Sequence, residues 1–196
     1  MSTLRTRDAE HLADFARLAA PLARRAVAVT DRGDGPAAHA SRLVDHWRRE
    51  AAVLSAAAGL GGRVSWAAQG AVSAVVQGSL VLCLCELAGV HDPRRRLEVV
   101  ARACLDSELP EGWQPGVEVH VVTDLGEPAR RSRLREAGRS AWAVWRVVGR
   151  RQEGRLWQRA LSNVPVVGAA GALLGERHAL AGIAVTAARE LDLPLA

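Results

Sequence analysis

The chain has 196 residues, a net charge of +5 and 49% hydrophobic residues, and it contains no lysine and no tyrosine. A chain of this length forms one domain that buries roughly 70% of the surface of the unfolded chain. Its three cysteines do not form the pattern of a disulfide framework, and its charged N-terminus does not resemble a secretory signal. We therefore expect a reducing, cytoplasmic setting.

The composition favours an all-α fold, because the abundant alanine, leucine and arginine residues are strong helix formers. We expect a single helical, bundle-like domain over residues 1–196, with glycine- and alanine-rich central helices and at most one short strand. Its main loop regions or helix breaks are expected at 36–62 and 108–127.

Two amphipathic helices open the chain. Apolar residues at three- and four-residue steps predict a helix over 8–29 and another over 37–58. A turn cluster at 31–36 separates the two helices, Pro21 introduces a kink into the first, and glycines at 59–62 end the second. The residues expected on the inner sides are Leu12, Phe15, Ala19, Leu22, Ala26 and Val29 in the first helix and Leu43, Trp47, Val53 and Leu54 in the second.

Residues 64–85 contain no charged side chain, and as a helix they extend for about 33 Å at about 1.5 Å per residue. This length is enough to cross a bilayer or to run through the centre of a helical domain. Polar residues recur at every fourth position and small residues form a neighbouring stripe, namely Ser65, Gln69, Ser73 and Gln77, and Gly70, Ala74 and Gly78. Aligned amides need protein partners, so we favour a central helix, and a membrane span is the alternative.

The next helix is expected over 93–107, with Asp92 as its N-cap and Pro93 at its first position. Glu86 is the acid that adjoins the apolar run, and we expect it to pair with a nearby arginine, because buried charges are rarely left unpaired. The inward residues are Leu97, Val100, Ala101 and Cys104, and the outward residues are Arg94, Arg95 and Arg96.

The second half of the chain begins with a loop that has one extended stretch at 117–121, followed by arginine-rich helices over 128–151 and up to 161. A last helix begins near Pro165, and one side of it is built from small residues: Gly168, Gly171, Gly175 and Ala179. We hypothesise that this thin face packs against the stripe formed by Gly70, Ala74 and Gly78.

Positive charge is concentrated in residues 130–159, where ten arginines outweigh Glu136 and Glu153 to give a local net charge of +8. A basic helix with a tryptophan at its border suits an anionic membrane surface or an acidic partner. The alternative is a solvated face in which arginines stack on the tryptophan. No nucleic-acid motif accompanies the charge, so we expect no nucleic-acid partner. The stripe consists of Arg135, Arg139, Trp142, Arg146 and Arg150.

Three pieces of the chain resemble the EcsC protein family, which is named for a protein encoded beside an ABC exporter. They are GLGG at 59–62 before the apolar helix, ELAGVHDPRRR at 86–96, and PVVGAAG at 165–171. The chain departs from the family pattern at Glu176, where the family usually has asparagine, and over 108–135. The resemblance implies a largely helical, membrane-associated protein and supplies no active-site residue.

The chain shows no pattern for a metal, a cofactor or a catalytic residue. Cys83 and Cys85 point to different sides of one helix, and His39, His46 and Asp45 do not complete a set of metal ligands. A G-x-S-x-G elbow is absent, and a phosphate loop is excluded because the chain has no lysine.

We therefore expect a non-catalytic, peripheral membrane-associated or partner-binding helical protein at the inner face of the membrane. Its expected partner is an anionic membrane surface or a membrane protein, and the family resemblance adds a link to an ABC transporter. Two alternatives stay open: a hydrolase-like enzyme with an unrecognised site, and an integral membrane protein that spans through 64–85. The oligomeric state does not follow from the sequence.

Overall fold

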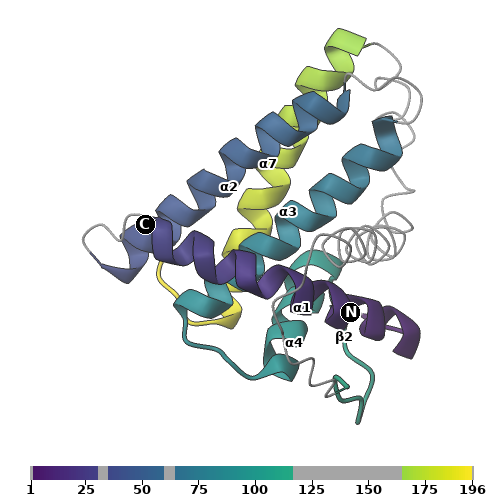
Figure 1. Ribbon diagram of the computed structural model, residues 1–196, viewed down its shortest axis with the longest axis vertical. Coiled ribbons are helices and arrows are strands. Elements are labelled where there is room, and N and C mark those ends of the chain that lie inside the picture. The colour runs from purple at the N-terminus through teal and green to yellow at the C-terminus, as the bar shows by residue number, and fades with distance from the viewer. Residues whose placement is uncertain (1, 31–34, 60–64, 117–164, 196) are drawn as a thin grey trace, which may run out of the picture.

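The structure, a computed structural model, describes the backbone of residues 2–30, 35–59, 65–116 and 165–195 and the side chains of 2–30, 35–51, 53, 72–116 and 178–195. This part is all-α, as the composition predicts, and contains five helices and two very short strands (Figure 1). In chain order they are β1 (Ser2–Thr3), α1 (Thr6–Val29), α2 (Pro36–Gly59), α3 (Ser65–Leu87), α4 (Pro93–Leu105), β2 (Ser107–Glu108) and α7 (Pro165–Glu190).

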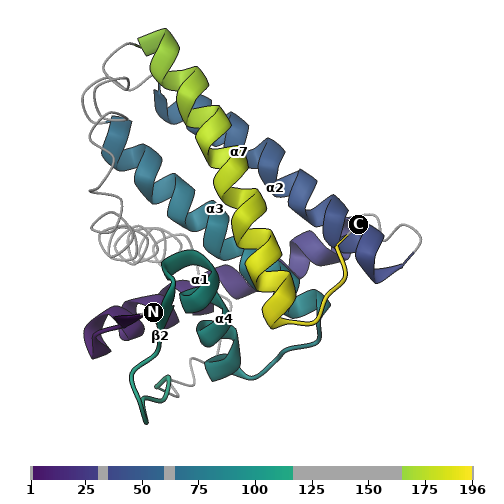
Figure 2. The ribbon, with the colours of Figure 1, turned by 180° about the vertical axis from the view of Figure 1, so that it is seen from behind.

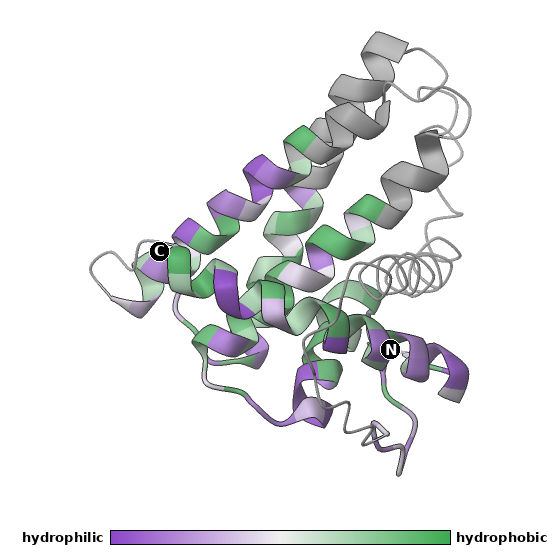
Figure 3. Cartoon of the chain, viewed as in Figure 1, coloured by the Kyte–Doolittle hydropathy of each residue, from purple (hydrophilic) through white to green (hydrophobic). Residues whose placement is uncertain are grey.

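Helix α3 is the centre of the described fold. It contacts α1, α2, α4 and α7, and every residue of 76–85 is buried. Figure 3 shows hydrophobic residues gathered along this half of α3 and on the helix faces around it. A helix that is surrounded on all sides needs no polar face, which explains the absence of charge from this stretch.

Helices α2, α3 and α7 lie side by side along the long axis of the molecule, and α1 crosses α3 near one end, close to α4 (Figure 1). Figure 2 shows the same bundle from behind, with α7 in front and α1 at the back. The two views place α1 and α7 on opposite faces of the bundle. The outer side of α1 is consequently a surface of the described domain.

Helix α1 packs on α3 through a narrow stripe of mostly small side chains. Its buried residues are Ala9, Leu12, Ala13, Phe15, Ala19, Ala23 and Ala26. The ring of Phe15 lies directly over Gly78 of α3, where an added Cβ would be 2.4 Å from Cε1 of the ring. Interiors are close-packed, so Gly78 provides the space that this ring occupies.

Backbone hydrogen bonds fix the turn between α3 and α4. Gly89 has a φ of +69°, and the N–H groups of residues 89 and 90 donate to carbonyls in the last turn of α3. This is the pattern of a Schellman cap, in which glycine is the favoured residue. Asp92 then caps α4 by accepting a hydrogen bond from the backbone N–H of Arg95 at 2.6 Å, so the predicted N-cap is confirmed.

A parallel sheet of two residues per strand joins β1 to β2. Residues 2–3 pair with 107–108, and the N–H of Leu4 donates to the carbonyl of Glu108 at 2.8 Å. Asp106 has a φ of +46° at the end of α4 and turns the chain into β2. The sequence did not indicate this pairing, because two residues cannot show an alternating pattern.

Three apolar side chains that were expected in the core lie on the surface instead. Leu22 is 60% exposed, Val29 is 71% exposed and Val53 is 65% exposed. The buried stripe of α1 passes through Ala19, Ala23 and Ala26, beside Leu22 and Val29 and not through them. Apolar residues at three- and four-residue steps fit two adjacent stripes of a helix, and the spacing alone does not decide between them.

The predicted helix boundaries agree with α1, α2, α3, α4 and α7 to within a few residues. A loop region or helix break was expected at 36–62. Over residues 36–59 this expectation is wrong, because α2 is continuous from Pro36 to Gly59. The turn at 31–34, the extended stretch at 117–121 and the arginine-rich helices over 128–161 lie outside the described residues. Within the described side chains, no helix combines the length and the hydropathy needed to cross a membrane.

Candidate functional site

The predicted binding stripe of Arg135, Arg139, Trp142, Arg146 and Arg150 lies outside the described residues. The side-chain surroundings of Gly70, Gly168, Gly171 and Gly175 lie outside them too, although α3 and α7 are in contact. Ala74 is buried, and the atoms nearest to the open side of Gly78 belong to Phe15 of α1. At Gly78 the small-residue stripe therefore packs against α1, and its packing against α7 elsewhere stays a prediction.

The polar row of α3 finds a partner inside the protein. Gln77 is only 5% exposed, and its side-chain amide donates a hydrogen bond to Oγ of Ser73 at 2.7 Å. The two residues are one helical turn apart, so the row is partly satisfied along its own helix. At Gln77 the helix is surrounded by protein, as the alignment of polar residues predicts.

A buried ion pair joins the end of α3 to α4. Nη2 of Arg96 lies 2.6 Å from Oε2 of Glu86, and only 12% and 17% of the two side chains are exposed. Arg96 also donates to the backbone carbonyl of Val90 and lies 3.1 Å from Nδ1 of His91. The predicted pairing of Glu86 with an arginine is confirmed. The outward position expected for Arg96 is wrong, because the buried carboxylate draws the guanidinium inward.

Two further glutamates hold the remaining arginines of α4. Arg94 binds Glu98 at 3.1 Å, and Arg95 lies 3.5 Å from both Glu98 and Glu190. Arg102 binds Glu190 at 2.9 Å, and this hydrogen bond raises the pKa of Arg102. Every arginine of α4 thus has a carboxylate partner, and Glu190 ties α4 to the end of α7. An anionic ligand would have to displace one of these carboxylates.

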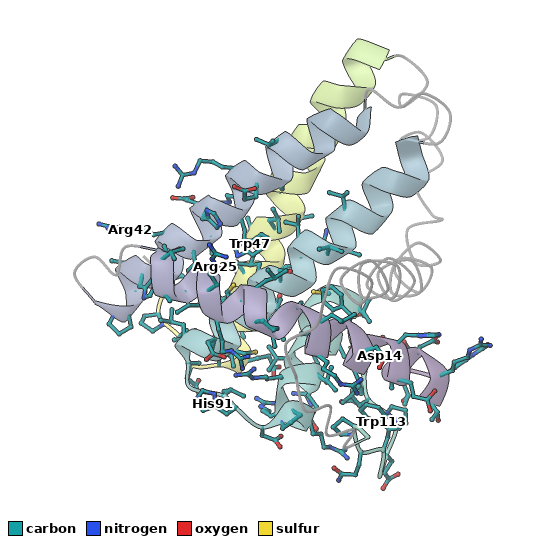
Figure 4. All side chains as sticks on the ribbon, in the orientation of Figure 1. Asp14, Arg25, Arg42, Trp47, His91 and Trp113 are labelled. Atoms are coloured by element: carbon teal, nitrogen blue, oxygen red, sulfur yellow. The ribbon has the colours of Figure 1, made fainter. Side chains whose placement is uncertain are left out.

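A hollow of about 510 Å³ opens beside this charged cluster, lined by Thr3, Arg94, Glu98, Arg102, Glu108, Leu109 and Glu111. Both of its arginines already bind carboxylates, and Arg94 also donates to the backbone carbonyl of Trp113, which is labelled near α4 in Figure 4. Its lining has more carboxylates than guanidinium groups. The hollow is therefore a poor site for an anion.

The thiols of α3 and α4 are protonated at neutral pH. Burial raises the pKa of Cys83 to about 11, although a hydrogen bond from the indole of Trp47 opposes the shift. Burial also raises the pKa of Cys85 and of Cys104 to about 12. A cysteine attacks a substrate or binds a metal as its thiolate, so these three residues are suited to packing and not to chemistry.

Cys83 serves as a junction of three helices. Its sulfur accepts a hydrogen bond from Nε1 of Trp47 in α2 at 3.3 Å and donates to the carbonyl of Ala23 in α1 at 3.7 Å. The sequence placed Trp47 on the inner side of α2, and its half-buried indole confirms that placement.

The described histidines have separate environments. His39 is 5% exposed and its Nε2 has no hydrogen-bond partner, whereas the ring of His46 meets the edge of the Trp47 ring at a centroid distance of 5.6 Å. His91 is exposed beside Arg96. Among the described side chains, no group of three or more histidine, cysteine, aspartate and glutamate residues could hold a metal ion.

The second half of α1 presents a basic and apolar surface, which we call the outer α1 face: Arg17, Leu18, Leu22, Arg24, Arg25 and Val29. Arg24 and Arg25 are exposed and bind no acidic side chain among the described residues. Figure 4 labels Arg25 on this half of α1 and Asp14 on the other half. This surface was not predicted from the sequence, because the helical spacing of the apolar residues places Leu22 and Val29 in the core. The signal that could have found it is the lack of any acid from 18 to 29 around two adjacent arginines.

Comparison of the chain with protein-family models, with curated proteins and with solved structures finds no match. The resemblance to the EcsC family therefore stays a prediction.

Proposed function

We propose that the chain is a non-catalytic helical protein that binds peripherally to an anionic membrane surface. The observation that carries the proposal is the outer α1 face, where Arg25 lies between the exposed side chains of Leu22 and Val29 and the exposed Arg24 lies at the edge. Guanidinium groups are attracted to anionic headgroups, and aliphatic groups beside them gain free energy by entering the interface.

The basic segment 130–159 supports the same function from the sequence. Each arginine close to an anionic membrane adds about 1 kcal/mol of binding free energy, so two arginines on α1 and four in the stripe 135–150 are enough for reversible binding. A weak contact on each of two surfaces is stronger in combination, because the second contact forms while the first holds the chain in place.

Binding fits the described side chains better than catalysis does. The arginines of α4 are held by carboxylates, and the thiols of Cys83, Cys85 and Cys104 keep their protons at neutral pH. The described residues therefore give no support to the hydrolase-like alternative.

A membrane protein is the other partner that the sequence suggests, and the EcsC resemblance adds a link to an ABC transporter. We place the lipid surface first because the outer α1 face combines the positive charge of Arg24 and Arg25, which bind no acidic side chain among the described residues, with exposed aliphatic groups. Headgroups and acyl chains complement both.

Vesicle binding tests the proposal. The full chain, expressed without detergent, should sediment with vesicles that contain phosphatidylglycerol and leave them in about 1 M salt, where the Debye length falls to about 3 Å. Equal binding to vesicles of pure phosphatidylcholine would contradict the electrostatic contact. Binding to native membranes without binding to vesicles would favour a membrane protein as the partner, and extraction only by detergent would favour the integral alternative.

A further inference from the structure

We infer that the outer α1 face is the surface by which the chain lies on an anionic bilayer, with Leu22 and Val29 between the headgroups and Arg24 and Arg25 against the phosphates. The inference rests on the proposed function and adds to it the element that makes the contact and its orientation. The sequence placed the membrane contact in another segment, at residues 135–150.

The aliphatic residues of this face are spaced for a helix that lies flat. Leu22 and Val29 are seven residues apart, so their side chains lie on one side of α1 about 10 Å from each other along the axis. Leu18 continues the row by one turn and is partly exposed. Two side chains that are 60% and 71% exposed on one line of one helix can enter an interface together without any change of fold.

The charge of this face has one sign. Arg25 lies between Leu22 and Val29, Arg24 lies at its edge, and the chain has no acidic residue from 18 to 29. Arg17 is 3.2 Å from Asp14, but both side chains are more than 40% exposed, and such surface pairs are weak. The face therefore complements a surface of negative charge.

The packing of α1 leaves this face open. The helix is held on α3 by alanines that lie beside Leu22 and Val29 and by Phe15 over Gly78, and this packing leaves the two aliphatic side chains 60% and 71% exposed. Figures 1 and 2 show α1 on the outside of the bundle, on the face opposite to α7. As far as the described residues go, a planar surface can consequently approach the second half of the helix.

Charge also argues against two other occupants of the face. The segment 130–159 of the same chain has a net charge of +8, so it would be repelled by Arg24 and Arg25. A second copy related by a two-fold axis would bring the same arginines against each other. An anionic bilayer satisfies both the charge and the aliphatic groups.

Paired substitutions in the full chain test the inference with vesicles of phosphatidylglycerol and phosphatidylcholine. Arg24→Gln with Arg25→Gln should lower the partition coefficient roughly 30-fold, and Leu22→Ser with Val29→Ser should lower it roughly tenfold or more. The matched controls are Arg49→Gln with Arg189→Gln, and Val53→Ser with Val185→Ser. They remove the same charge and the same kind of exposed aliphatic group from α2 and α7, and they should change binding less than threefold.

A dye at one position reports the orientation directly. The native thiols have raised pKa values, so a maleimide dye at near-neutral pH should label Leu22→Cys selectively. An environment-sensitive dye at position 22 should shift to the blue on anionic vesicles, and the same dye on Val53→Cys should not. This readout also applies if one of the paired variants folds poorly.

Each outcome distinguishes the inference from the proposed function. If the wild-type chain does not bind anionic vesicles, both fail. If it binds, but the α1 variants bind equally well and the substitution of Arg135, Arg139, Arg146 and Arg150 by glutamine abolishes binding, the inference fails and the proposed function stands. A blue shift at position 53 and not at position 22 would also overturn the inference, because it places α2 on the bilayer.

Discussion

Helices α1 and α4 both carry several arginines, but their surroundings differ. On α4 each arginine meets a carboxylate from α3, α4 or α7, and the Arg96–Glu86 pair is mostly buried. On the second half of α1 the adjacent Arg24 and Arg25 have no described acidic partner, and the aliphatic residues beside them are exposed. Net charge alone does not separate these two cases.

The comparison teaches that the neighbours of an arginine decide its role. A paired, half-buried arginine joins helices, and its removal affects the stability of the fold. An exposed, unpaired arginine contributes little to stability and is free to meet a partner.

The stability of the fold at high pH compares the side of α3 that faces α1 with the side that faces α4, because each side has a buried thiol. The unfolded thiols ionise near a pKa of 9.0, whereas burial raises the pKa of Cys83 to about 11 and of Cys85 and Cys104 to about 12. Stability is therefore complete below about pH 8 and falls as the pH rises through 9, because the unfolded chain loses its protons first. At pH 10 each thiol should lower the free energy of unfolding by about 1.4 kcal/mol, or about 4 kcal/mol together.

Urea unfolding at pH 7, 9 and 10 measures this loss. The chain suits the measurement because it has no lysine or tyrosine that would titrate in the same range. Cys83→Ala, on the α1 side, and Cys85→Ala, on the α4 side, should each remove about a third of the pH-dependent loss. A smaller share for Cys83 would show that the α1 side of the core is more open to water, and a free energy that stays constant to pH 10 would contradict the burial of the thiols.

Glu86→Ala should lower the free energy of unfolding by about 3 kcal/mol, because it leaves the buried guanidinium of Arg96 without its carboxylate. Chemical denaturation of the variant at pH 7 measures the effect. The double variant with Arg96→Met should recover part of the loss, since the unpaired charge is then removed. A loss below about 0.5 kcal/mol, which is typical of a surface ion pair, would show that the paired arginine of α4 contributes no more to stability than the exposed arginines of α1.

Gly78→Ala should lower the free energy of unfolding by about 2 kcal/mol, because the added Cβ would overlap the ring of Phe15. A double-mutant cycle with Phe15→Leu checks the cause. In the Phe15→Leu background the alanine should cost clearly less, and strictly additive effects would show that the α1–α3 contact is elsewhere.

Glu190→Gln should lower the free energy of unfolding by about 1 kcal/mol, because Arg95 and Arg102 both lose a charged partner in a half-exposed position. The loss should shrink in about 1 M salt, where exposed charges are screened. An effect that does not depend on salt would show that Glu190 acts through its packing and not through its charge.

Arg24→Gln with Arg25→Gln should change the free energy of unfolding by less than about 0.5 kcal/mol, because neither side chain has a described partner. Denaturation of this variant also serves as the folding control for the vesicle experiments. A loss comparable to that of Glu86→Ala would mean that α1 uses its arginines in the same way as α4.

The features that the sequence predicted are those with local causes. Helix ends follow from the residue types at the ends, as with Asp92 before Pro93 and Gly89 after α3. The pairing of Glu86 follows from the cost of an isolated charge next to an apolar run, and any nearby arginine satisfies it.

The features that the sequence did not predict depend on how the helices meet. By spacing alone, Leu22 and Val29 fit the buried side of α1 as well as Ala19, Ala23 and Ala26 do. The close approach of α1 to α3 at Gly78 decides which of these two stripes is buried. For the same reason the partner of Gly78 was expected on α7 and is Phe15 of α1. The outer α1 face was missed because it consists of the residues that this choice leaves outside.

The pairing of β1 with β2 has a consequence for synthesis of the chain. Oγ of Ser2 lies 3.3 Å from Oγ of Ser107, a separation of 105 residues along the sequence. On the ribosome residues 2–3 thus have no place to dock until α4 and β2 have emerged, several seconds later at about 5–20 residues per second. The alanines and Phe15 of α1 wait only for α3, so residues 2–3 are the last part of this end of the chain to find their partner, and their edge is open to unwanted association for longest.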